Sequence, residues 1–216
     1  FSADATGTNA GVTFNLDGTA KQTITGSANA DTININKTGA AHDVDAGSGD
    51  DTVDLKAAVG TTAIDVDGNA GTDTLKAILN NTATDFTAVS TFENLELTVG
   101  AGVSAGFDDS SEDGGLNAAS NIKILGGDAD STFIVGGGSN AVIDDAGSAQ
   151  TIDATGFSGD IDVDVASGAF DSDLTILGGA GGQGDKVHVT LAPGPNDVAK
   201  MEGIETLTLA NASANS

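Results

Sequence analysis

Aspartate and glycine recur together in this sequence at a spacing that could bind a divalent cation. Three turns end in Asp-Thr followed by an apolar residue, and their aspartates are Asp31, Asp51 and Asp73, so the sequence interval is first 20 and then 22. Calcium takes about six to eight oxygen ligands, and glycine lets backbone carbonyls converge on an ion because it adopts positive φ. The spacing therefore predicts calcium sites at these turns.

The predicted calcium ligands come from these three turns and from two weaker copies. In the three best turns they are Gly26, Asn29, Asp31, Gly47, Gly49, Asp50, Asp51, Gly68, Gly71 and Asp73. In the weaker copies they are Gly126, Gly127, Asp128 and Asp130, then Gly179, Gly181 and Asp185. An alternative stays open, in which the same residues form plain β-turns whose aspartates satisfy local hydrogen bonds.

A second motif occurs twice in the chain. Residues 73–98 align with 185–210 at a constant offset of 112, and the match continues upstream at an offset of 110. One of its six identities is the pair Glu93/Glu205, for which we favour a structural role at a strand start over metal binding. In the first copy Asp85 suits the N-cap of a single helical turn, and alternating leucines after Glu93 indicate a strand.

The elements that must position these turns are short β-strands. Asp, Gly, Thr and Asn are poor helix formers, and apolar and polar residues alternate in segments such as 32–36 and 186–190. A repeat of about twenty residues is the unit of a parallel β-roll or β-helix. We therefore expect an all-β parallel β-solenoid with coils of that length and Gly-Asp turns. Residues 1–216 form one unit, or two lobes (1–99 and 120–210) joined by a loose acidic segment.

Composition excludes several classes of protein. The chain has 32 acidic residues against 7 lysines, a formal net charge of −25, and neither arginine nor cysteine. The negative electrostatic field of so acidic a chain excludes binding to nucleic acid, whose phosphates need positive charge. The missing cysteines exclude disulfides and cysteine-ligated zinc. No apolar run is long enough to span a membrane. With 38% apolar residues the chain can fold, provided that something offsets the repulsion between its acidic residues.

Catalytic groups are scarce. The two histidines, His42 and His188, have no neighbouring pattern that indicates a catalytic triad, and we expect both on the surface. Adjacent acids such as Asp50 and Asp51 point to opposite faces of a strand, so they rarely form a glycosidase pair. We therefore expect that the chain is not an enzyme.

The Gly-Asp turns resemble those of the RTX family, secreted bacterial proteins whose nonapeptide repeats wind into a calcium-bound β-roll. The turn 46–54 matches that nonapeptide with Ala in place of its first glycine. The endings of the second motif, at Glu93 and Glu205, are similar to elements of large RTX-type surface-layer (S-layer) proteins and adhesins. Adjacent tandem nonapeptides are missing, so scattered sites are expected rather than a regular row of ions.

The resemblance implies a calcium-binding structural module of a secreted bacterial surface assembly, an S-layer or sheath. Calcium would drive folding and self-association into a homo-oligomer or lattice at the cell surface, with cell-surface polysaccharide as a further partner. Two alternatives are an adhesin or glycan-binding segment and the non-catalytic RTX portion of a secreted hydrolase.

Overall fold

The computed structural model describes most of the chain. The described residues are 1–37, 41–59, 65–79, 84–85, 89–101, 104–108, 121–127, 131–135, 150–158, 160–165, 172, 174–179, 184–191 and 199–211. Within them, twenty strands and no helix form, and every strand pairing is parallel. In this part of the chain, no helix is long and apolar enough to cross a membrane.

The strands form three sheets, here called A, B and C. Sheet A contains β1 (Ser2–Asp4), β3 (Thr23–Thr25), β5 (Asp43–Asp45), β7 (Asp65–Asp67) and β10 (Val89–Ser90). Sheet B contains β2 (Thr13–Leu16), β4 (Thr32–Ile35), β6 (Thr52–Val59), β8 (Thr74–Leu79), β11 (Asn94–Val99), β13 (Asn121–Gly126), β15 (Gln150–Phe157), β17 (Leu174–Leu177) and β19 (Lys200–Glu202). Sheet C contains β9 (Thr84–Asp85), β12 (Ser104–Asp108), β14 (Thr132–Val135), β16 (Asp160–Val165), β18 (Lys186–Leu191) and β20 (Thr206–Asn211).

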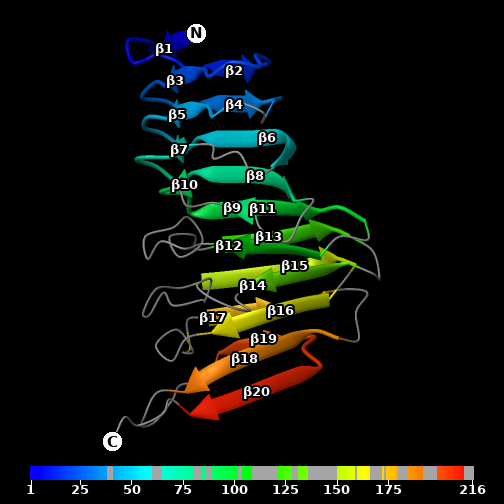
Figure 1. The fold of residues 1–216 in the computed structure, drawn as a ribbon. Helices are drawn as coiled ribbons and strands as arrows, with labels where there is room; N and C mark the ends of the chain where they lie inside the picture. Colours follow the sequence, from blue (N-terminus) through cyan, green and yellow to red (C-terminus); the bar gives the residue numbers. More distant parts are fainter. Residues whose placement is uncertain are drawn as a thin grey trace, which may run out of the picture.

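These sheets are the faces of a parallel β-solenoid, as the sequence predicts. Each strand pairs with the strand one coil before and one coil after it, so the coils stack from the N-terminus to the C-terminus (Figure 1). In sheet B, one register position is occupied by Thr13, Thr32, Thr52 and Thr74, whose sequence numbers advance by 19, then 20, then 22. The coil length expected from the sequence is therefore confirmed in the first half.

Coils lengthen in the second half of the solenoid. There the register-matched positions of sheet B are Asn94, Asn121, Thr151 and Thr175, whose sequence numbers advance by 27, then 30, then 24. The stretch that the sequence marks as loosest, 100–119, contains strand β12, and residues 109–120 lie outside the described part. Sheet B nevertheless continues without interruption, because β11 pairs with β8 on one side and directly with β13 on the other.

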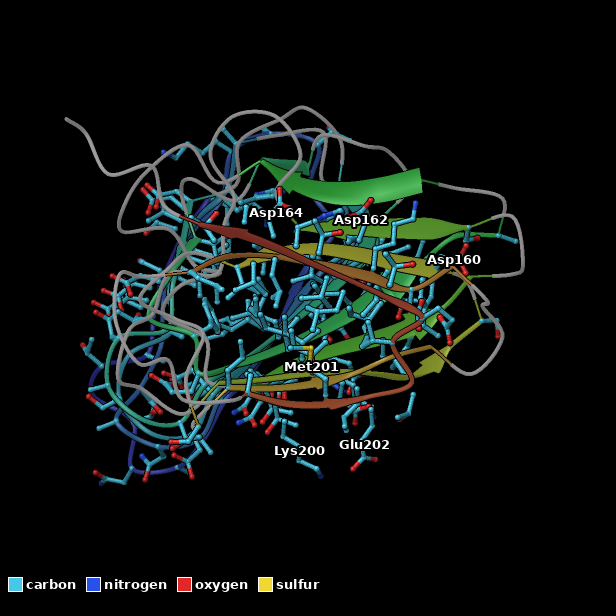
Figure 2. The ribbon with its side chains drawn as sticks, turned by 90° about the horizontal axis from the view of Figure 1, so that it is seen from below. Asp160, Asp162, Asp164, Lys200, Met201 and Glu202 are labelled. Atoms are coloured by element: carbon cyan, nitrogen blue, oxygen red, sulfur yellow. The ribbon has the colours of Figure 1, made fainter. Side chains whose placement is uncertain are left out.

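The core consists of inward rows of apolar side chains that stack from coil to coil. One row of sheet B is Phe14, Ile33, Val53, Leu75, Leu95, Ile122, Ile152, Ile176 and Met201. Burying each such side chain stabilises the fold by about 1.5–3 kcal/mol. Figure 2 looks along the stack from its C-terminal end, where Lys200 and Glu202 point away from the interior on either side of Met201.

The duplicated sequence occupies a different pair of faces in each copy. Strand β8 of sheet B corresponds at the offset of 112 to β18 of sheet C, and β11 corresponds to β20. At the offset of 110, β7 of sheet A corresponds to β17 of sheet B. The second copy is therefore advanced by one face around the solenoid. Sheet A ends and sheet C begins within one coil, which contains both β9 and β10.

The helical turn expected after Asp85 does not extend to Val89, and residues 86–88 lie outside the described part of the chain. Asp85 lies in β9 and pairs with Asp108, and Val89 lies in β10 and pairs with Val66. A residue that extends a parallel ladder takes extended backbone, so Val89 is a strand residue and not part of a helix.

Candidate cation site at the Gly-Asp turns

The aspartates of the three best turns stack in single file at the corner between sheets A and B. The main-chain N–H of Asp31 donates to Oδ1 of Asp51 at 2.7 Å, and the N–H of Asp51 donates to Oδ1 of Asp73 at 2.7 Å. The N–H of Asp73 in turn donates to Oε2 of Glu93 at 2.7 Å. We call Asp31, Asp51, Asp73 and Glu93 the first acidic column. In it, each acid of one coil caps the strand start of the coil before.

A second acidic column lies at the corner between sheets B and C. Asp185 accepts the N–H groups of Ile161 at 2.8 Å and of Gly179 at 2.6 Å, and its own N–H donates to Oε2 of Glu205 at 3.0 Å. The structural role expected for Glu93 and Glu205 is thus confirmed, because each satisfies a backbone donor at a strand start.

The aspartates of the columns are buried. Asp31 is 2% exposed, Asp51 1%, and Asp73 and Asp185 0%. Both oxygens of Asp31 accept hydrogen bonds, from Val12 N–H at 2.6 Å and from Ser27 N–H at 2.5 Å. In contrast, Oδ2 of Asp51 and Oδ2 of Asp73 have no hydrogen-bond partner among the described residues. Two neighbouring carboxylates therefore each hold one buried oxygen that a ligand could satisfy.

Burial raises the pKa of these carboxyl groups. It raises the pKa of Asp51 to about 6, since burial outweighs the hydrogen bond from Asp31 that favours the charged form. Burial also raises the pKa of Asp73 and of Asp185, and nearby Glu93 and Glu205 add to this effect. The columns are thus sites where negative charge is costly and a cation would be favourable.

Glycine is required where a carboxylate folds back into its own turn. A Cβ on Gly26 would lie 2.7 Å from Oδ2 of Asp31 and would collide with the carbonyl oxygen of Ala46 in the next coil. A Cβ on Gly68 would lie 2.9 Å from Oδ2 of Asp73. The repeated Gly-x-x-x-x-Asp spacing therefore lets each aspartate pack against its own turn while the coils stack closely.

The other glycines of the motif shape the turns and stack on one another. Gly47 and Gly49 have φ of +104° and +115°, which favour glycine. A Cβ on Gly49 would lie 2.6 Å from the carbonyl carbon of Asn29, and one on Gly71 would collide with Gly49. Asn29, Gly49 and Gly71 thus occupy one position in successive coils, as the motif alignment predicts.

Several turn carbonyls already accept hydrogen bonds from a neighbouring coil. The carbonyl of Ser27 accepts Ser48 N–H at 3.0 Å, and that of Ala70 accepts Gly49 N–H at 2.8 Å. The carbonyl of Gly47 accepts an N–H from the next coil in the same way. On the exposed side, Oδ1 of Asp50 accepts Thr72 N–H at 3.0 Å. An ion at these turns would therefore bind carbonyl oxygens through their remaining lone pairs.

The two weaker copies differ from the best turns. Gly126 and Gly127 have φ of +78° and +67°, and buried Ser131, in the position of the aspartate, donates its hydroxyl to the carbonyl of Gly100 at 3.2 Å. In the last copy Gly179 serves as a hydrogen-bond donor to Asp185. Asp128, Asp130 and Gly181 lie outside the described residues.

Within the described ranges, no three acidic or histidine side chains converge on one point to hold a metal ion. The acids of each column follow one another along the solenoid axis, so adjacent carboxylates belong to adjacent coils. Calcium coordination at the predicted ligands therefore stays a prediction, which rests on the buried carboxylates rather than on a preformed cage.

The expectation that both histidines lie on the surface is wrong for His42. His42 is fully buried, its Nδ1 accepts Gln22 N–H at 3.3 Å, and its Nε2 lies 2.7 Å from the carbonyl of Lys37. The alternation of His42 with inward-facing Val44 and Ala46 could have indicated this burial. His188 does lie at the surface, with Nε2 3.1 Å from Oδ1 of Asp162.

Comparisons with protein-family models, with curated proteins and with solved structures gave no match. The fold and the two acidic columns are the features of the chain that bear on its function. Together they identify an all-β parallel solenoid with buried carboxylates at two of its corners.

Proposed function

We propose that this chain is a calcium-stabilised structural module of an extracellular bacterial surface assembly, an S-layer or sheath. The observation that carries the proposal is the pair Asp51 and Asp73. They are neighbours in the first acidic column, both are buried, and each has one oxygen without a hydrogen-bond partner among the described residues. A divalent cation would satisfy such oxygens and offset the cost of burying two charges.

The outer face of sheet A adds a second reason for cation binding. Strands β5 and β7 place Asp43 opposite Asp65 and Asp45 opposite Asp67. Like charges directly opposite each other destabilise a sheet, and Lys21, 3.4 Å from Asp43, is the lysine that the structure pairs with this row. With a net charge of −25, the folded chain gains stability from any cation that binds the folded state more tightly than the unfolded one.

The last described coil presents apolar side chains that the proposed self-association would cover. Leu207 and Leu209 of β20 continue the inward rows of Val187 and Val189, yet they are 47% and 54% exposed. Apolar positions of a solenoid interior are normally covered by the next coil. A contact that covers these leucines would bury apolar surface and extend the stack.

Thermal unfolding with and without calcium tests the proposal. We expect about 1 mM calcium, the range in which extracellular calcium modules are occupied, to raise Tm by about 5 °C over EGTA at matched ionic strength. Magnesium should raise Tm by less than calcium does, because it demands a stricter octahedral geometry and loses its bound water reluctantly. Particle size measured in the same buffers should increase with calcium.

The double variant Asp51→Asn/Asp73→Asn localises the effect. It should fold in EGTA and lose the calcium-dependent rise in Tm, whereas Glu202→Gln, which removes one charge from an exposed side chain, should keep that rise. Equal Tm values in calcium, magnesium and EGTA would overturn the proposal. An undiminished calcium response in the double variant would overturn the assignment to the first acidic column.

A further inference from the structure

The two ends of the solenoid expose apolar side chains. Among the described residues, the large apolar side chains at the surface are Phe1, Leu207 and Leu209, which belong to the first and last coils. Two inward-facing residues of the same coils, Ala3 of β1 and Met201 of β19, are only partly buried. Both ends therefore leave part of the core uncovered, although a solenoid is normally closed by terminal coils with a polar outer face.

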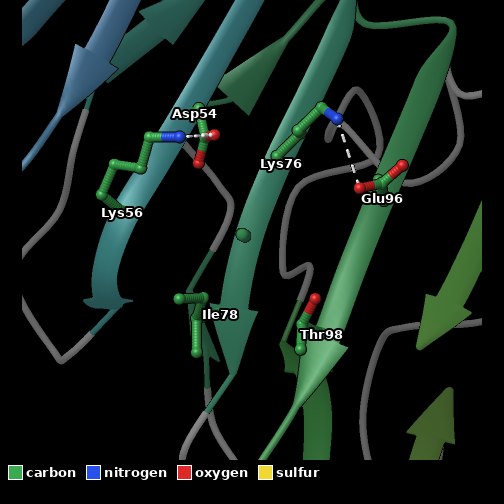
Figure 3. A pocket seen from close by; sticks show the side chains of 7 residues that line it. Asp54, Lys56, Lys76, Ile78, Glu96 and Thr98 are labelled. Atoms are coloured by element: carbon green, nitrogen blue, oxygen red, sulfur yellow. Dashed lines mark hydrogen bonds and ion pairs between the residues drawn. The ribbon is translucent and has the colours of Figure 1, made fainter. Parts of the chain in front are cut away.

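The sides of the solenoid carry charge instead. Sheet A has the opposed aspartates of β5 and β7, and β16 of sheet C carries three outward aspartates (Figure 2). The middle of sheet B has a groove of about 300 Å³, in which Lys76 pairs with Glu96 and Lys56 pairs with Asp54 (Figure 3). Both lysines of the groove thus already have an anionic partner. The uncovered apolar surface of the described chain is therefore at its ends.

The sequence duplication shows what kind of element covers these ends. The two exposed leucines of β20 correspond, at the offset of 112, to Leu95 and Leu97 of β11, which are 2% and 0% exposed. The next strand of sheet B, β13, pairs with β11 and places Ile122 beside Leu95 and Ile124 beside Leu97. A parallel strand with apolar residues at alternate positions would therefore cover β20 in the same way.

A strand of this kind lies at the other end of the same chain. β2 is the outermost strand of sheet B at the N-terminal end, so its free edge presents backbone N–H and C=O groups. Phe14 and Leu16 of β2 face inward, and Phe14 is only partly buried. The first strand of this sheet thus has the alternation that β13 has, and its apolar row is incompletely covered.

Register within the chain defines how β2 of a second copy would meet β20. In sheet B, Thr13 and Asn94 belong to one row, and Asn94 corresponds to Thr206 at the offset of 112. A second copy that continues this row places its Thr13 beside Thr206. Its inward Phe14 and Leu16 then lie over the two exposed leucines of β20.

A second copy turned by one face joins both pairs of edges at once. The first coil ends in β1 of sheet A and β2 of sheet B, whereas the last ends in β19 of sheet B and β20 of sheet C. An advance by one face brings β1 onto β19 and β2 onto β20, and the same advance already relates the two sequence copies within the chain. Stacking sheet B on sheet B would instead pair β2 with β19 and leave β20 open.

We propose that a second copy of this chain stacks head to tail on the last coil, advanced by one face, with its β2 on β20 and its β1 on β19. The proposal rests on the self-association in the proposed function and needs none of its calcium sites. The two contacting surfaces differ, so each added copy offers a new open end and filaments form. Glu202 would lie opposite Asp4 of the next copy, so added salt should strengthen the contact.

Variants blocked at one end test this contact by sedimentation in the calcium buffer. Leu207→Glu/Leu209→Glu blocks the last coil and Phe14→Glu blocks the first, and each should weaken association at least about tenfold. Thr206→Glu/Thr208→Glu adds the same two charges to the outer face of β20 and should weaken association less than about twofold. Circular dichroism checks that each variant is folded.

Mixing the blocked variants distinguishes head-to-tail stacking from other pairings. The variant blocked at the last coil keeps a natural first coil, and the variant blocked at the first coil keeps a natural last coil. Each alone should remain monomeric, whereas an equimolar mixture should form a heterodimer that grows no further. If Phe14→Glu fails to fold, Ala3→Glu on β1 blocks the same end.

Several outcomes would overturn the proposal. These are a natural chain that stays monomeric, a mixture that does not associate, and an outer-face control that weakens association as much as Leu207→Glu/Leu209→Glu. Association of the first-coil variant alone would show that two last coils pair with each other instead. The calcium-dependent rise in Tm is a separate measurement, so the head-to-tail contact and the calcium sites of the proposed function fail independently.

Discussion

The main-chain N–H of Asp73 donates to Oε2 of Glu93 at 2.7 Å, and the equivalent residues of the second copy, Asp185 and Glu205, repeat this hydrogen bond at 3.0 Å. The two bonds lie at different corners of the solenoid, because the second copy is advanced by one face. The same Asp-Glu hydrogen bond therefore forms at either corner of the solenoid. In each case a glutamate of one coil accepts the main-chain N–H at the strand start of the coil before.

Truncating Glu93 tests the strength of this unit. Glu93→Ala leaves the N–H of fully buried Asp73 without its acceptor, and we expect a loss of about 1–3 kcal/mol in the free energy of unfolding. Glu93→Gln keeps an acceptor oxygen and should lose less. Urea denaturation measures both, with Glu202→Ala at the exposed surface as control. Equal stability of Glu93→Ala and the natural chain would contradict the assigned role.

The raised pKa of Asp51 predicts an unusual pH dependence. Burial raises it from 3.8 to about 6 in the folded chain, so folding favours the protonated form. The contribution of Asp51 to stability is greatest below about pH 4 and falls as the pH rises through about 6. In EGTA, the chain should therefore gain stability between pH 7 and pH 5.

Asp51→Asn isolates this residue from the general effect of net charge. The variant carries a neutral side chain at every pH, so its stability should change less between pH 7 and pH 5 than that of the natural chain. Glu202→Gln, at the exposed surface of sheet B, should retain the natural slope. The interpretation fails if the Asp51→Asn and natural curves of Tm against pH are parallel.

The first glycine of a turn should tolerate no side chain. Gly26→Ala places a Cβ against its own aspartate and the carbonyl of Ala46, and we expect a loss of about 1–3 kcal/mol from overpacking. A Cβ on Gly7 meets nothing within 4 Å, so Gly7→Ala should be close to neutral. Denaturant midpoints of the two variants provide the comparison, and similar midpoints would show that the turn can relax.

Much of this fold could be predicted from local patterns. Alternation in segments such as 32–36 identifies strands, and the spacing of Asp31, Asp51 and Asp73 gives the coil length because stacked coils repeat one turn at one corner. The position of Glu93 at a strand start likewise predicts a backbone acceptor. These inferences succeed because each depends on a short stretch of sequence and on stacking between neighbouring coils.

Other features depend on relationships that no local pattern contains. The second copy is advanced by one face after the long coils around β13. The number of residues in a coil does not by itself specify which sheet a given strand joins. The groove beside Lys76 arises from the register between three strands. Whether Oδ2 of Asp51 or of Asp73 finds a hydrogen-bond donor depends on which N–H groups its turn directs inward. These N–H groups differ between turns that share one motif.

The buried histidine provides the last prediction. Both ring nitrogens of His42 contact backbone groups, Gln22 N–H and the Lys37 carbonyl, which join its coil to the preceding one. His42→Ala removes both contacts and leaves a cavity, so we expect a loss of about 2–4 kcal/mol in the free energy of unfolding. His188→Gln alters a half-exposed pair with Asp162 and should lose at most about 1 kcal/mol. Urea unfolding of the two variants at pH 7 measures this difference. If His42→Ala proved no more destabilising than His188→Gln, the two backbone contacts would not hold these coils together.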